Sequence, residues 1–191
     1  MRRNWLVLAA LAVAVLQIGF LSWIIAGRAS VLRNGQEILL KVEPVDPRDL
    51  LRGDYVRLGY EIATIPAAIL QPPPAGEGVY GDRPVWVLVT KGADGVFGAT
   101  AASFDRAALA ASGPDSAVLA GTASGIPATG APALVTYGME RFYLPEGEGL
   151  QIEQDMRERP FFVVAAVAGN GTAQIKRFLD GETVLYEEPL Y

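Results

Sequence analysis

The chain of 191 residues contains no cysteine and no histidine. Without cysteine it can form no disulfide, no thiolate metal site and no cysteine nucleophile. Without histidine it lacks the commonest general base and the commonest transition-metal ligand. Most zinc, iron and serine-triad chemistries are therefore excluded, and we expect no cofactor.

Basic residues are also fewer than acidic ones. The chain has 16 Lys and Arg against 21 Asp and Glu, and residues 1–27 hold two of the arginines and no acid. The remainder therefore carries 14 basic and 21 acidic residues, a net charge of −7. Because a negative surface repels phosphate backbones, we expect no binding to nucleic acid.

One long segment lacks charge altogether. Trp5–Ala26 is apolar over 22 residues, which as a helix spans about 33 Å and crosses the ~30 Å hydrocarbon core of a bilayer. Trp5 and Trp23 lie near its ends, where indole rings prefer the headgroup boundary. The alternatives are a cleaved signal peptide, whose apolar core would be shorter, and a buried helix. We therefore predict a transmembrane anchor at residues 5–26, in contact with lipid.

The flanking charges set the orientation. Arg2 and Arg3 precede the segment, whereas Arg28 and Arg33 follow it. A short tail with clustered positive charge favours the cytoplasmic side. We expect residues 1–4 in the cytoplasm, a juxtamembrane linker at 27–35, and an extracytoplasmic domain at 36–191.

The signals after residue 35 are those of strands and turns. Apolar or β-branched runs alternate with Gly- and Pro-rich turns, and helical periodicity is limited to short stretches at 105–111 and 151–159. The predicted strands are Gln36–Glu43, Tyr55–Ile62, Val85–Val89, Val96–Ala101, Phe161–Val167 and Ala173–Phe178. The fold class expected is mainly β, a barrel or sandwich-like domain of about eight strands.

A faint internal repeat accompanies this pattern. At an offset of 79 residues, segment 38–61 shares four identities with segment 117–140. At an offset of 76, Arg83-Pro84 and Arg159-Pro160 each open a predicted hairpin. We predict two related four-stranded units, a hypothesis that requires the two segments to have the same local fold.

The densest segment precedes and enters the second strand. Pro44 and Pro47 exclude regular helix and interior strand, so residues 44–52 should form a structured loop. The acids Asp46, Asp49 and Asp54 alternate with Arg48 and Arg52. Arginine binds carboxylates in two-point fashion, so ion pairs within the loop are the preferred interpretation; a partner-docking loop and a calcium site are the alternatives.

The strand that follows has two distinct faces. Gly53 allows the chain to turn into the strand. Strand alternation then places Tyr55 on one face and puts Val56, Leu58 and Tyr60 on the opposite face. We predict that Val56, Leu58 and Tyr60 face the core.

Segment 53–60 matches the signature Gly-Asp-Tyr-x-x-Leu-x-Tyr and resembles the bacterial GDYXXLXY family. A second block, Tyr137–Glu153, is also similar to that family. The resemblance implies a membrane-associated bacterial protein of uncharacterised role. Together with the predicted anchor and its orientation, it leads us to expect a single pass in the bacterial cytoplasmic (inner) membrane, with the C-terminal domain on the periplasmic or extracellular side. It also implies a multi-span membrane-protein partner and no catalytic residues. The motif, structural or partner-docking residues expected are Asp46, Arg48, Asp49, Arg52, Gly53, Asp54, Tyr55, Leu58, Tyr60, Glu140 and Glu146.

We favour a non-enzymatic binding or accessory role, for a membrane-protein partner or an envelope component, over two enzymatic alternatives. Paired carboxylates among Glu140, Glu146, Glu148 and Glu153 would suit a glycosidase, although a solvated loop is the preferred interpretation. A signal-peptidase-like enzyme needs a serine after the helix and a neutral lysine; Ser30 lacks the expected setting, and no lysine lies in a matching motif. A ligand-sensing domain with a pocket lined by Tyr55 or Tyr143 is the third alternative.

Overall fold

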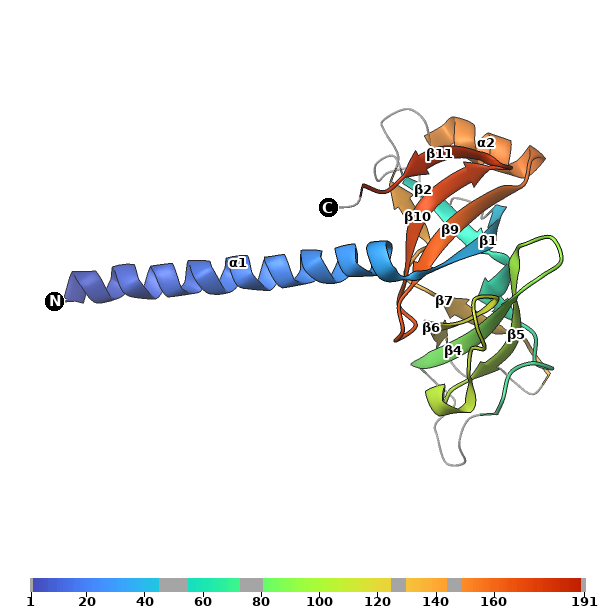
Figure 1. Ribbon diagram of the computed structural model, residues 1–191, viewed down its shortest axis with the longest axis horizontal. Helices are drawn as coiled ribbons and strands as arrows, with labels where there is room; N and C mark the ends of the chain where they lie inside the picture. Colours follow the sequence, from blue (N-terminus) through green and yellow to red (C-terminus); the bar gives the residue numbers. More distant parts are fainter. Residues whose placement is uncertain (1, 45–54, 73–80, 125–129, 144–148, 190–191) are drawn as a thin grey trace.

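The computed structural model describes residues 2–44, 55–72, 81–124, 130–143 and 149–189. Helix α1 (Arg2–Asn34) projects from a β domain that contains one further α-helix, α2 (Gly149–Glu158), within the described residues (Figure 1). The segment Trp5–Asn34 of α1 is long and apolar enough to cross a membrane, and its most apolar 18-residue window is not buried by the rest of the protein. Residues 28–34, part of the predicted linker, continue the same helix.

Eleven strands form the β domain in the described part of the chain, compared with the eight or so expected. They are β1 (Gln36–Pro44), β2 (Tyr55–Tyr60), β3 (Thr64–Ile65), β4 (Asp82–Lys91), β5 (Phe97–Ser103), β6 (Ser116–Ser124), β7 (Ala133–Thr136), β8 (Arg141–Tyr143), β9 (Phe161–Val167), β10 (Ala173–Asp180) and β11 (Thr183–Glu187). Two 3₁₀ turns, η1 (Glu61–Ala63) and η2 (Arg106–Ala108), complete the elements. The predicted mainly β class is confirmed.

The strands form two antiparallel sheets. One has the order β11-β10-β9-β1-β2-β8 and the other the order β3-β7-β6-β4-β5. Side chains from both inner faces belong to one hydrophobic core, which includes Leu40, Leu58, Val87 and Leu119. Helix α2 packs against β1 and β2 and adds Ile152 and Met156 to that core. The domain is therefore held together mainly by apolar burial between the sheets.

The two sheets are built from two copies of one chain pattern. Strands β1, β2, β3, β4 and β5 correspond in order to β6, β7, β8, β9 and β10, and β11 is the additional strand. Each sheet combines strands of both copies. In one sheet β1 pairs with β9 and β2 with β8; in the other β6 pairs with β4 and β7 with β3. The two halves of the domain are therefore exchanged, and each half completes the sheet of the other.

The equivalence extends to single residues in the hairpins. In β5 Thr100 is skipped between the partners of Val89 and Leu88, and in β10 Lys176 is skipped between the partners of Ala165 and Val164. The two β-bulges thus lie 76 residues apart. Both hairpin turns also place a glycine at positive φ, Gly95 at 84° and Gly171 at 90°. The predicted repeat is therefore present as structure.

The register corrects one part of the sequence alignment. Strands β1 and β6 correspond at the offset of 79, so Glu43 is equivalent to Thr122. Glu43 pairs with Gly59 in β1–β2, and Thr122 pairs with Thr136 in β6–β7. This places β2 and β7 at an offset of 77, so Tyr60 is equivalent to Tyr137. The identities found at 79 beyond the first strand do not link equivalent residues, because the connection between the two strands differs by two residues in length.

The helix is joined to the β domain without a flexible spacer. Gly35 alone separates α1 from β1, and its amide donates to Val31 O at 2.8 Å. Ala29 and Leu32 are buried where α1 contacts β9 and β10. A β-carbon at position 35 would lie 2.5 Å from Val31 O and 3.0 Å from Val167 N, so glycine is required for this close approach.

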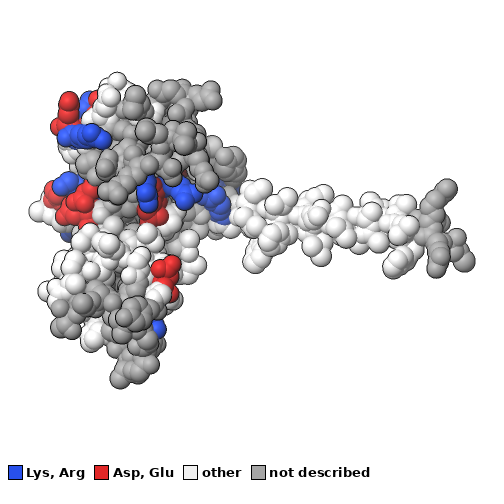
Figure 2. Space-filling view, turned by 180° about the vertical axis from the view of Figure 1, so that it is seen from behind, with Lys and Arg blue, Asp and Glu red and all other residues white. Residues whose placement is uncertain are grey.

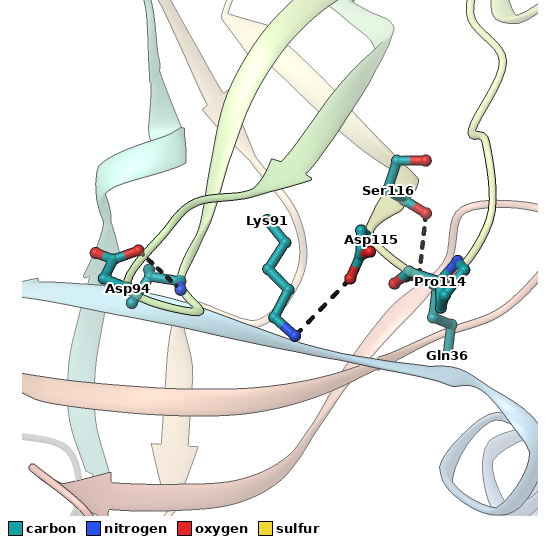
Figure 3. Close-up of polar contacts among 7 residues, drawn as sticks. Gln36, Lys91, Asp94, Pro114, Asp115 and Ser116 are labelled. Carbon is teal, nitrogen blue, oxygen red and sulfur yellow. Dashed lines mark hydrogen bonds and ion pairs between the residues drawn. The ribbon is translucent and has the colours of Figure 1, made fainter.

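The start of β1 is also fastened to the other half of the domain. The Gln36 side-chain amide donates to Pro114 O at 2.8 Å and to Ser116 O at 3.0 Å (Figure 3). Lys91 contacts Asp115 beside them, with 3.8 Å between Nζ and Oδ1. The helix is thus mounted on both sheets.

Candidate functional site

The two sequence blocks that carry the family resemblance lie side by side. Strand β2 pairs with β8, so Tyr55 is opposite Tyr143, Val56 opposite Phe142, and Arg57 opposite Arg141. The Leu58 amide donates to Glu140 O at 2.9 Å. Val56, Leu58 and Tyr60 are buried, as predicted. We call this region, residues 56–62 and 137–142, the motif junction.

Two buried tyrosines join the halves at the motif junction. The Tyr60 hydroxyl donates to Met139 O at 2.7 Å, and the Tyr137 hydroxyl donates to Ile62 O at 2.6 Å. Burial, and secondarily the negative charge of Glu140, raises the pKa of both phenols above the ordinary value. Both side chains therefore remain neutral hydrogen-bond donors at physiological pH.

Glu140 closes the turn between these elements. Its carboxylate oxygen Oε1 accepts a hydrogen bond from the Tyr137 amide, while its carbonyl accepts the one from Leu58. Gly138 within this turn has a φ of 79°, a conformation that favours glycine. The carboxylate predicted as a motif residue is thus engaged with the backbone of its own turn.

The chemistry available at the motif junction is that of a structural clamp. Its phenols are protonated and bonded to carbonyls, and its carboxylate is bonded to an amide, so the described atoms offer no activated nucleophile or base. Within the described ranges no three acidic side chains gather to hold a metal ion. Neither of the two best-defined cavities is lined by a residue of the motif junction.

The serine and the lysines of the peptidase alternative each contact another residue in the structure. The Ser30 hydroxyl accepts from Asn34 Nδ2 at 3.4 Å on the surface of α1. Each of the three lysines contacts a carboxylate: Lys41 with Glu61 at 3.6 Å, Lys91 with Asp115 at 3.8 Å, and Lys176 with Glu37 at 2.8 Å.

Several predicted site residues lie outside the described residues: Asp46, Arg48, Asp49, Arg52, Gly53, Asp54 and Glu146. The predictions of an ion-paired, docking or calcium-binding loop therefore stay predictions. Of the others, the structure brings Leu58, Tyr60 and Glu140 together and places the backbone of Tyr55 at the start of β2. Tyr143, which the ligand-sensing alternative would place in a pocket, lies on β8 with 73% of its surface exposed.

Sequence reasoning missed the second tyrosine of the clamp. Tyr60 and Tyr137 are 77 residues apart, whereas the four sequence identities occur at an offset of 79. The alignment at 79 therefore does not show that the two tyrosines are equivalent. It also did not anticipate the cavities at the end of α1. Arg33 and Arg106 line two adjacent cavities at the base of α1, and they are far apart in sequence with no shared motif.

Comparison with known proteins gives one match. The family model described as GDYXXLXY protein matches residues 17–178, from within α1 through most of β10. No curated protein and no solved structure matches the chain. The matched range includes both strands of the motif junction and both tyrosines of its clamp. The chain therefore belongs to the GDYXXLXY family.

Proposed function

We propose that this chain is a single-pass protein of the bacterial cytoplasmic membrane. Its β domain, outside the cytoplasm, serves as a non-enzymatic accessory for a multi-span membrane-protein partner. The observation that carries the proposal is the rigid mount of the β domain on α1. Gly35 alone separates helix and sheet, and Ala29 and Leu32 are packed beneath β9 and β10. A domain fixed in this way has a set height and orientation above the bilayer.

The height can be estimated from the helix. Residues 27–34 extend α1 by eight residues beyond the predicted span, or about 12 Å. The polar layer on each side of the hydrocarbon core is roughly 5–8 Å thick. The β domain therefore lies just above the headgroups, within reach of the extracytoplasmic loops of a neighbouring membrane protein. A free substrate far from the membrane would be served equally well by a flexible tether.

The chemistry at the motif junction supports a non-enzymatic role. Its tyrosines and Glu140 are bonded to backbone groups that join the two halves. The lysines of the peptidase alternative are paired with carboxylates. These are the features of a scaffold, which presents a stable surface to a partner.

Co-purification tests the proposal. The full chain should be expressed in its native membrane, extracted in a mild detergent and recovered by a C-terminal tag. A multi-span membrane protein is expected in near-stoichiometric amount. Absence of such a partner under gentle extraction, with the chain itself recovered from the membrane fraction, would contradict the accessory role.

A matched variant tests the mount. Insertion of Gly-Ser-Gly between Asn34 and Gly35 keeps the anchor and the β domain but separates them with a flexible spacer. We expect recovery of the partner to fall about tenfold while membrane fractionation stays unchanged, because a loose domain loses its preorganised position. Unchanged recovery would show that the fixed orientation has no role.

Protease digestion of intact spheroplasts tests the orientation in the membrane. We expect protease added from outside to cleave the β domain.

A further inference from the structure

Two cavities lie near the C-terminal end of α1; the first is lined by residues of the helix alone, and the second also by residues of the β domain. The first, about 530 Å³, is lined by Ile25, Ala26, Ala29 and Arg33, with Ser22, Ser30 and Asn34. The second, about 290 Å³, lies under the β domain and is lined by Asn34, Gln36, Arg106 and the turn at Gly169, among others. Asn34 borders both, and we call the two together the groove.

The two ends of this groove differ in chemistry. Ile25 and Ala26 belong to the charge-free segment predicted to lie in the hydrocarbon core. Arg33 lines the first cavity and Arg106 the second, and Figure 2 shows basic side chains, with acidic ones among them, where α1 meets the β domain. Helical side chains tilt toward the helix N-terminus, so the guanidinium of Arg33 is directed back toward the bilayer.

The arginines of the groove are not neutralised by the described residues. Arg106 donates through Nη1 to Leu109 O at 2.7 Å, and neither it nor Arg33 forms an ion pair there. Two carboxylates are paired with other cations, Glu37 with Lys176 and Arg177 and Asp115 with Lys91. The Asp105 carboxylate, next to Arg106 in the chain, accepts from the Ala107 amide and contributes one negative charge. The helix C-terminus contributes about half a negative charge, which two guanidinium groups exceed.

We infer that this groove binds an anionic phospholipid, with its phosphate between Arg33 and Arg106 and an acyl chain along Ile25 and Ala26. Charge complementarity selects the anionic headgroup, and arginine suits phosphate oxygens because it can donate two hydrogen bonds. Continuity with the apolar helix surface selects a lipid over a free phosphate. The inference rests on the membrane anchoring proposed above, and it gives the β domain a second attachment to the bilayer.

Arg28 supplies a matched control. It is an exposed cation on the same helix, five residues before Arg33, and lines neither cavity. At 100° per residue it lies on the opposite side of α1 from the groove. A general attraction of basic residues to an anionic surface would involve Arg28 as much as Arg33.

The test is lipid titration of the full chain in detergent, read by native mass spectrometry. Phosphatidylglycerol and phosphatidylcholine with identical acyl chains serve as probes. We expect wild type to bind phosphatidylglycerol at least about tenfold more tightly. Arg33→Ala and Arg106→Ala should each weaken that binding about tenfold, whereas Arg28→Ala should change it by less than about twofold. Arg106→Lys, which keeps the charge, should retain most of the binding if Arg106→Ala acts through phosphate rather than through Leu109.

Four outcomes overturn the inference. They are no headgroup preference, an equal effect of Arg28→Ala, loss of binding in Arg106→Lys equal to that in Arg106→Ala, and competition by inorganic phosphate as effective as by the lipid.

A photo-crosslinker at Ser30 in cells gives a further test. Labelled lipid supports the inference, whereas a labelled protein shows that the groove docks a helix instead. In each of these cases the chain is still recovered with membranes, so the proposed anchoring stands. Loss of membrane association altogether would contradict both proposals.

Discussion

Tyr60 and Tyr137 occupy equivalent positions in the two halves of the domain, and each donates a hydrogen bond to a carbonyl two residues beyond the other. The distances are 2.7 Å to Met139 O and 2.6 Å to Ile62 O. The bonds are reciprocal, so neither half forms this contact without the other. They join the strand of the family signature to the second block that is similar to the family, Tyr137–Glu153.

The first prediction concerns removal of either phenolic hydroxyl. Tyr60→Phe and Tyr137→Phe keep the ring in the core but leave a carbonyl without its donor in a buried place. Each variant should lose about 1–3 kcal/mol in free energy of unfolding. The two losses should be similar because the contacts are equivalent. Denaturant unfolding of the full chain in detergent, followed by circular dichroism, measures them.

Tyr186→Phe is the matched control for these variants. Its ring packs against Phe142 with 5.9 Å between ring centroids, and its hydroxyl forms no hydrogen bond with the described residues. We expect a change of less than about 0.5 kcal/mol. A loss at Tyr60 or Tyr137 no larger than that at Tyr186 would show that the reciprocal bonds do not stabilise the fold.

The second prediction concerns alkaline pH. Burial raises the pKa of Tyr60 and Tyr137 in the folded chain, whereas an unfolded tyrosine ionises near pH 10. Above about pH 10 the unfolded chain releases protons that the folded chain retains, so stability present below that pH is lost as pH rises. The slope is at most about 1.4 kcal/mol per pH unit for each tyrosine. Unfolding at pH 9, 10 and 11 should show a smaller slope in the double Phe variant; an unchanged slope would assign the loss to other groups.

Much of the fold follows from local sequence features. The charge-free Trp5–Ala26 run, the apolar hairpin strands and the Gly-Asn-Gly turn all depend on neighbouring residues, and the structure has the corresponding helix, strands and turn. The buried face of β2 followed from strand alternation alone. These elements were predictable because their cause lies within a few residues of the chain.

The exchange of strands between the halves was not predictable in this way. Nothing in β1 indicates that its partner is β9, more than 100 residues later, because both central strands of a sheet present similar apolar runs. The small strands β3 and β8 have only two and three residues, too few for a pattern. The groove at Arg33 and Arg106 depends on this tertiary arrangement, and so it too has no signal in the sequence.

The third prediction uses the equivalent turn glycines as a matched pair. Gly95 and Gly171 both have positive φ, so alanine is strained at either position by about 1–2 kcal/mol. A β-carbon at Gly95 meets no atom within 4 Å, whereas one at Gly171 would lie 2.8 Å from Ala120 N, whose amide donates to Gly171 O at 2.9 Å. Gly171→Ala should therefore be more destabilising than Gly95→Ala, by a further ~1–3 kcal/mol. Thermal unfolding compares the two variants, and equal losses would show that the close contact of Gly171 with Ala120, which joins the two sheets, adapts to the extra carbon without loss of stability.

The last prediction concerns the carboxylate beside the helix mount. Glu37 accepts from Lys176 Nζ at 2.8 Å and from Arg177 Nη2 at 2.5 Å. The bulge at Lys176 brings both cations to one carboxylate, because the extra residue interrupts the alternation of β10. The Lys176 hydrogen bond, with the charges of Arg177 and Lys176, holds the pKa of Glu37 below its ordinary value against the opposing effect of burial.

Glu37→Gln should therefore lower the free energy of unfolding by about 1 kcal/mol at pH 7, since the side chains are partly exposed and screened. Because the pKa of Glu37 is lower in the folded chain, its contribution is complete above the unfolded pKa near 4.3 and is lost as pH falls through the folded value. The difference between wild type and variant should thus disappear in strong acid, and it should shrink in about 1 M salt. Glu61→Gln, which removes the exposed contact with Lys41 at 3.6 Å, should change stability by less than about 0.5 kcal/mol. Denaturant unfolding between pH 3 and 7 compares the two variants; an equal effect of both would show that the bulge gives Glu37 no advantage over an ordinary surface ion pair.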